Sequence, residues 1–195
     1  KANLYNISAG ATGSGTASVT AVAVVTYFEN ETLAYVIGGT EDAHTSIGSA
    51  DNKISGKVQI LATSNEMVTA DAAAVAGSGA AGVTGALDVI VTQFTTKAYT
   101  GKYVDIYTAG DLEIKGNDTF DVYAIIASVA IGGAAGVGVI AFANVSFSTV
   151  EAAIGANNTV VANNVNVAAL ADRNVLGVTA NAAGGTGGVA IMVTV

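Results

Sequence analysis

The segment Ile126–Ala143 reads IASVAIGGAAGVGVIAFA, and its interpretation decides the fold of this 195-residue chain. Read alone, about eighteen residues without a charge favour a membrane-spanning helix. The corresponding segments elsewhere argue against a helix, because one reads ATGSGTASVTAVAVVT from Ala11 and another reads GVTGALDVIVTQF from Gly82, with Asp88 inside it. A carboxylate at bilayer depth costs about 2.5–3.5 kcal/mol. The sequence therefore predicts no membrane span.

A repeat with a period of about 53–54 residues relates these segments. The tetrapeptides KVQI, DLEI and NVNV, which begin at Lys57, Asp111 and Asn164, mark the same point in successive repeats. A second marker follows each tetrapeptide and has a match at the N-terminus in NLYNISA from Asn3, and a glycine-rich box follows each of these four segments, at Gly10, Gly77, Gly132 and Gly184. Four boxes delimit about three repeats, so we expect one continuous array over residues 1–195.

The first repeat is about ten residues longer than the others. We place the extra residues near positions 39–48, because TLAYVIG from Thr32 and HTSIG from His44 both resemble TVEAAIG from Thr149. The insertion is acidic, since it contains Glu41 and Asp42, and it holds the only histidine.

Within a repeat, apolar residues recur with a period of two. Val150, Ala152 and Ile154 share one face of an extended segment, and turn residues such as those of 155–158 follow it. Strands with one buried face and tight corners, without helices between them, predict an all-β parallel β-helix (β-solenoid). We expect about three coils of roughly eighteen residues in each repeat. The alternative is a β-sandwich filament subunit of the pilin type.

The composition excludes several functional classes. The net charge is −8, and the seven Lys and Arg residues are scattered, so no basic stripe exists for nucleic acid. Cysteine is absent, which excludes thiol chemistry and disulfides. One histidine and one arginine, Arg173, leave little for a catalytic triad or a lyase. We predict no enzymatic activity and no cofactor, with a carbohydrate-active β-helix enzyme as the alternative.

Acidic pairs are the weak candidates for a metal site. Carboxylate oxygens are the ligands that Ca²⁺ prefers, and extracellular solenoids often bind this cation. The pairs are Glu41 with Asp42, Asp111 with Glu113, and Asp118 with Asp121. Their spacing fits neither an EF-hand nor a calcium-binding nonapeptide repeat, so a solvated surface is the preferred interpretation.

The sequence also contains candidate sites for glycosylation and for aromatic binding. Five N-x-S/T sequons are candidate glycosylation sites, at Asn6, Asn30, Asn117, Asn144 and Asn157. In a chain this rich in Asn, Ser and Thr they are only a weak indicator of a surface context. Tyrosines cluster in the first two repeats; an outward row of them would suit a carbohydrate or a neighbouring subunit, and packing in the core or across strands is the preferred interpretation.

The third repeat carries a family resemblance over about residues 128–195. Its features are the box GGAAGVG from Gly132, TVEAAIG from Thr149, NNTVVANNVNVAA from Asn157 and NVLGVTANAAGG from Asn174. This segment resembles the repeats of very large secreted bacterial exoproteins of the leukotoxin and filamentous-haemagglutinin-like type. The resemblance implies an extracellular, cell-surface β-helix rod for adhesion or toxin display in virulence, and it carries over no catalytic residue.

We therefore expect an extracellular structural or adhesive protein that forms a rod or filament. Uncapped ends of a solenoid expose unpaired strand edges. The expected partners are a second copy stacked head to tail or the continuation of a longer chain, and a host-cell or glycan ligand. The alternative is a pilus-like subunit that assembles by strand exchange.

Overall fold

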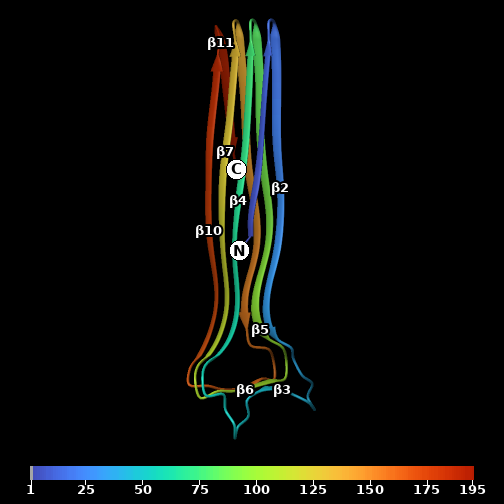
Figure 1. The fold of residues 1–195 in the computed structure, drawn as a ribbon, viewed down its shortest axis with the longest axis vertical. Coiled ribbons are helices and arrows are strands. Elements are labelled where there is room, and N and C mark those ends of the chain that lie inside the picture. Colours follow the sequence, from blue (N-terminus) through green and yellow to red (C-terminus); the bar gives the residue numbers. More distant parts are fainter. Residues whose placement is uncertain (1) are drawn as a thin grey trace.

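In the computed structural model, which describes residues 2–195, the chain folds into parallel β-strands (Figure 1). The strands are β1 (Ala2–Ser14), β2 (Ala17–Val36), β3 (Thr45–Ile47), β4 (Val58–Ser78), β5 (Ala81–Thr100), β6 (Val104–Tyr107), β7 (Leu112–Gly132), β8 (Ala135–Ala153), β9 (Thr159–Val161), β10 (Val165–Gly184) and β11 (Gly187–Thr194). They form sheet A in the order β1-β4-β7-β10, sheet B in the order β11-β8-β5-β2, and sheet C in the order β3-β6-β9. The predicted parallel β-solenoid is confirmed, and the β-sandwich alternative is excluded because successive repeats pair in parallel.

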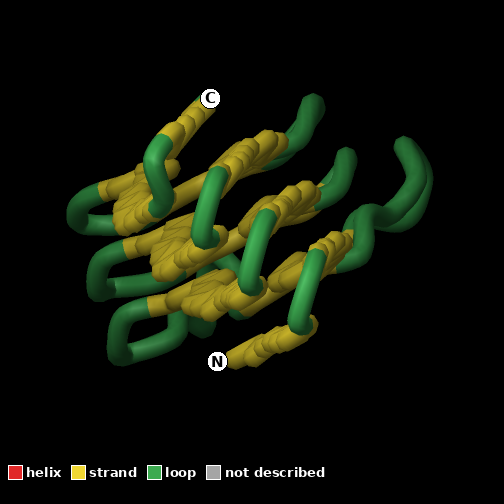
Figure 2. Tube along the Cα trace, turned by 90° about the horizontal axis from the view of Figure 1, so that it is seen from above, coloured by secondary structure: helices red, strands yellow, loops and turns green. Residues whose placement is uncertain are grey.

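Each repeat forms one coil, so the prediction of three short coils per repeat is wrong. β4 pairs with β7 in register along 21 residues, from Val58 opposite Leu112 to Ser78 opposite Gly132. At about 3.3 Å per residue the long strands span roughly 65 Å, whereas four coils stack over roughly 19 Å. The molecule is thus a flat slab that is longest along its strands, with the coils stacked across them (Figures 1 and 2).

The segment Ile126–Ala143 is the end of β7, a corner at Gly133–Ala134, and the start of β8. The other glycine boxes also contain the corners between sheets A and B, which confirms that they turn the chain. Neighbouring corners are bonded to each other, since the amide of Gly79 donates to the carbonyl of Ser14 at 3.2 Å. Within residues 2–195, no helix has the length and apolar character needed to cross a membrane.

The stacked corners require glycine at the position of Gly133. A Cβ atom there would meet the carbonyl oxygen of Gly79 far inside van der Waals contact. We expect Gly133→Ala to lower the free energy of unfolding by about 1–3 kcal/mol, as judged by urea denaturation. Gly77→Ala is the matched control, because a Cβ at Gly77 meets no atom within 4 Å. Equal unfolding midpoints for the two variants would contradict this role of the corner.

The extra residues of the first repeat flank β3 on both sides. Residues of the first coil pair with residues of the second coil, and the number of positions between the two partners decreases in two steps along the coil. Ala17 pairs with Ala81, Thr45 pairs with Val104, and Val58 pairs with Leu112. The separation shrinks by five positions across the loop before β3 and by five more across the loop after it. The second group of extra residues therefore lies beyond the predicted range of 39–48.

The core is thin near the glycine corners and wider at the opposite end. Between sheets A and B, β4 contributes four buried alanines, Ala70, Ala72, Ala74 and Ala76. Small inward side chains let the two sheets approach closely. At the other end, sheet C closes the coil around a second cluster that includes Ile60, Ile106 and Ile114. Buried polar groups, among them Glu66 and Asp118, lie between these two regions.

Candidate functional site

A buried polar cluster crosses the solenoid near the middle of its long strands. Glu66 of β4 is 1% exposed and Asp118 of β7 is fully buried. Arg173 of β10 donates to Asp118, and its guanidinium lies 5.8 Å from the centre of the Phe120 ring. The cluster thus joins β4, β7 and β10, which are neighbouring strands of sheet A from three successive coils.

Polar side chains of other strands complete the cluster. Glu66 accepts hydrogen bonds from the Asn30 amide of β2, at 2.6 Å, and from the Ser64 hydroxyl. The Ser148 hydroxyl of β8 donates to Asp118 at 3.1 Å. Both sheets and all four coils therefore contribute to one hydrogen-bonded group.

Of the two buried carboxyl groups, Glu66 has a raised pKa. Burial raises the pKa of Glu66, and its hydrogen bond to Asp118 and the charge of Asp118 raise it further, against the lowering effect of Ser64 and Asn30. Like charges in a low-dielectric interior disfavour two ionised carboxylates side by side. The environment of Glu66 thus favours its protonated form, while the guanidinium of Arg173 lies against Asp118.

This cluster specifies the register of the stack. A shift of one residue between neighbouring strands would move an inward side chain to the outer face. Such a shift in β10 would withdraw Arg173 and leave the Asp118 charge buried without a partner, which costs several kcal/mol. The role of the cluster is thus structural, because its hydrogen bonds hold the four coils in one register.

Sequence reasoning found only part of this cluster. It named Asp118 as an acidic pair with Asp121, yet an odd separation puts the two side chains on opposite faces of β7. Asp118 points inward and Asp121 outward. The alternation of inward and outward residues could have predicted the opposite orientations of Asp118 and Asp121. The hydrogen bond between Glu66 and Asn30 could not be predicted from a local pattern, because the two residues are 36 positions apart.

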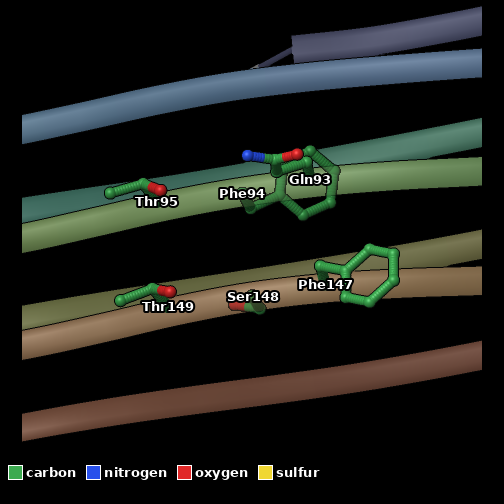
Figure 3. Close-up of a pocket in the computed structure, with 6 residues that line it drawn as sticks. All are labelled: Gln93, Phe94, Thr95, Phe147, Ser148 and Thr149. Atoms are coloured by element: carbon green, nitrogen blue, oxygen red, sulfur yellow. The ribbon is translucent and has the colours of Figure 1, made fainter.

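A shallow groove adjoins the cluster on sheet B. Its volume is about 350 Å³, and it is lined by Gln93, Phe94, Thr95, Phe147, Ser148 and Thr149. Figure 3 shows Thr95 and Thr149 on one side, and Gln93, Phe94 and Phe147 on the other. The Phe147 side chain is 61% exposed. The groove thus combines an exposed aromatic ring with amide and hydroxyl groups.

A second buried carboxyl group lies apart from the cluster. Asp88 of β5 is fully buried, and neither of its carboxyl oxygens has a hydrogen-bond partner among the described residues. Burial, with a smaller contribution from the charge of Asp71, raises its pKa to about 6.

The histidine contacts a carboxyl group of the next coil. His44 Nδ1 and Asp105 Oδ2 of β6 are 3.1 Å apart, and the His44 ring lies 5.4 Å from that of Tyr103. The hydrogen bond from His44 is the main cause that lowers the pKa of Asp105. The pair connects the loop before β3 to the next coil.

The candidate calcium ligands lie in separate places. Glu41 and Asp42 form the tip of the turn between Thr40 and Ala43, before β3. Asp111 accepts hydrogen bonds from the amides of Asn163 and Asn164, and Glu113 of β7 pairs with Lys57 and Gln59. In the part of the chain that the structure describes, no three His, Cys, Asp or Glu side chains gather as a metal site.

The five sequons divide between interior and surface. Asn6 donates to Thr26, Asn30 donates to Glu66, and the buried oxygen of Asn144 has no partner within the described chain. Asn117 points outward from β7. Asn157 is exposed at a corner with φ of 57°, where asparagine tolerates the left-handed conformation. Glycan attachment stays a prediction. Only Asn117 and Asn157 have side chains placed so that a glycan could be attached.

The chain matches no protein-family profile, no curated protein and no solved structure. The functional proposal therefore rests on the geometry of the chain itself.

Proposed function

We propose that this chain is a structural segment of an extracellular β-solenoid, which extends by stacking coil on coil and presents its outer faces for adhesion. Each outer strand would template a further coil. Growth in this direction would repeat the outer surface of the sheets along a filament.

The free strand edges carry this proposal. Sheet A ends on β1 and β10, and sheet B ends on β2 and β11, so that within residues 2–195 these outer edges have no paired strand. A strand edge is a row of donors and acceptors that templates the next strand. Inward apolar side chains of β10 also lack a cover, since Val175 is 48% exposed. A further coil would satisfy the edge and bury these side chains together.

The groove beside Phe147 supports the adhesive part of the proposal. An exposed aromatic ring can pack on the apolar face of a sugar ring, while neighbouring amides and hydroxyls bond to its hydroxyl groups. Gln93, Thr95 and Thr149 offer those groups. Repetition of such a surface along a filament would increase avidity for a clustered glycan ligand.

Blocking one edge tests the stacking. We expect the wild-type chain to form fibres with a subunit repeat of about 19 Å, seen by electron microscopy and by sedimentation velocity. Val175→Lys places a charge on the surface that a further coil would bury, and burial of an unpaired charge costs several kcal/mol. We expect this variant to weaken end-on association by at least about 100-fold.

Val178→Lys is the matched control. Val178 lies in the same strand and is also 48% exposed, but it points outward from sheet A. We expect its fibres to equal those of the wild type. A wild-type chain that stays without fibres, with its β-sheet content intact by circular dichroism, would overturn the proposed stacking.

A further inference from the structure

The outer surface of sheet B has an uncharged half next to the glycine corners. We call this surface the apolar face: the outward side chains of residues 17–27, 81–91, 135–145 and 187–193. All of them are Ala, Val, Leu, Ile or Gly except Tyr27. Val19 and Val25 are 67% and 66% exposed. On sheet A the corresponding surface is interrupted by Asp71 and Asp121.

The apolar face is large enough for a specific contact. Ten residue steps at about 3.3 Å and four strands at about 4.8 Å give roughly 600 Å². This is the size of the largest apolar patches on soluble monomers, which are often functional. Two such faces in contact would bury about 1,200 Å² in total, the lower bound for stable protein interfaces.

At the level of Ala21 and Ala23, the shape of the apolar face differs between its β2 edge and its β11 edge. A hollow of about 450 Å³ extends from Ala21 and Ala23 of β2 across Gly85 of β5 to Val139 and Ala141 of β8. At the same level along the strands, β11 carries Ile191 and Val193. At this one level, small residues on the β2 edge and large residues on the β11 edge make the surface complementary to itself when it is turned over.

We infer that the apolar face binds the same face of a second copy of this chain, about a two-fold axis parallel to the strands and between β5 and β8. This axis places β2 of one copy opposite β11 of the other and keeps every residue at its level along the strand. Ile191 and Val193 of the second copy then lie over Ala21 and Ala23. The same contact occurs twice, as an isologous interface requires.

The charges outside the apolar face agree with this arrangement. Lys97 of β5 and Glu151 of β8 are 3.1 Å apart within one chain. The two-fold axis brings Lys97 opposite Glu151 of the second copy, so opposite charges meet. Glu29 and Glu31 of β2 lie beyond the level of Thr194, the last residue of β11 that the structure describes as paired. No pair of like charges from the described strands of sheet B is brought together, despite the net charge of −8.

Gly85 offers a substitution that changes the face without changing the fold. A Cβ atom at Gly85 meets nothing within 4 Å, and the position lies in the hollow. Gly85→Glu would place a carboxylate against the apolar residues of the second copy. Gly77→Glu is the matched control, because Gly77 is equally open but points outward from sheet A.

The experiment separates lateral pairing from end-on stacking by using Val175→Lys as the background. We expect this variant to sediment as a dimer at about 100 μM. Addition of Gly85→Glu is expected to yield monomers with at least about 100-fold weaker association, and addition of Gly77→Glu to leave the dimer. Circular dichroism reports whether each variant keeps its sheets.

The outcomes distinguish this inference from the proposed function. A monomeric Val175→Lys variant, or a dimer that persists with Gly85→Glu, overturns the face-to-face pairing whether or not wild-type fibres form. Flotation with phosphatidylcholine vesicles tests the other apolar occupant. If the Val175→Lys variant is monomeric and floats with vesicles, and Gly85→Glu abolishes flotation, the face binds lipid and the second copy is excluded.

Discussion

Replacement of Phe120 by alanine is expected to lower the free energy of unfolding by about 3–5 kcal/mol, the largest loss for any single side chain considered. Phe120 is fully buried in β7. Its ring packs against Phe94 at 4.7 Å between centroids, and Phe94 packs against Phe28 at 5.4 Å. With Arg173 on its other side, the column runs through all four coils. The substitution would open a cavity in the middle of this column.

The same loss would weaken the buried cluster, because the Phe120 ring faces the guanidinium that neutralises Asp118. We would measure unfolding in urea, followed by far-ultraviolet circular dichroism. Tyr123→Ala removes an aromatic side chain from the outer face of the same strand, where it is 37% exposed, and we expect at most about 1 kcal/mol for it. Similar losses for the two variants would contradict the column as the centre of stability.

Replacement of Asp88 by valine is expected to stabilise the protein by about 3 kcal/mol at neutral pH. Asp88 is flanked in register by Val24 and Phe142, so an apolar side chain of similar size suits the position. Its buried carboxylate has no hydrogen-bond partner among the described residues. The variant removes the cost of ionising that group in the interior.

The sign of the pH dependence follows from the raised pKa. The pKa of Asp88 is about 6 in the folded protein against 3.8 as the ordinary value, so folding favours the protonated form. Below pH 3.8 both states are protonated and the group causes no loss. Stability is lost as the pH rises from 3.8 to about 6, at about 1.4 kcal/mol per pH unit, and the loss is complete above that range.

Urea denaturation at intervals from pH 4 to pH 8 would check this expectation. The stabilisation by Asp88→Val should grow with pH and level off above about 6. Glu66 also has a raised pKa, so part of the slope should remain in the variant. Asp121→Asn, on the outer face of β7, is the control and should not alter the slope. Parallel curves for Asp88→Val and the wild type would refute the assignment.

The repeat and the alternation made most of the fold predictable. The spacing of KVQI, DLEI and NVNV located the coil period, and the observed pairing of Val58 with Leu112 and of Leu112 with Val165 keeps that spacing. The glycine boxes marked the corners correctly, because close stacking of backbones excludes side chains there. What failed was the division of a repeat into three short coils.

That failure has a physical cause in the polar residues of the long strands. Glu66, Asp118 and Arg173 interrupt the apolar pattern in the middle of β4, β7 and β10, where a local pattern indicates a strand end. In the folded chain they face inward and satisfy one another, so the strands continue through them. Most of the candidate site was missed for the same reason, since its members look like breaks when each is read in its own segment, and only Asp118 was named as a candidate ligand.

The sequence alone determined the period, the two faces of each strand and the positions of the glycine corners, because these depend on residues that are neighbours in the chain. The tertiary structure decided the length of the strands, the buried cluster and the self-complementary outer face. These depend on pairs such as Asp118 and Arg173, which are 55 residues apart. Only the stacking of coils brings such residues within hydrogen-bond distance and decides which polar groups can be buried.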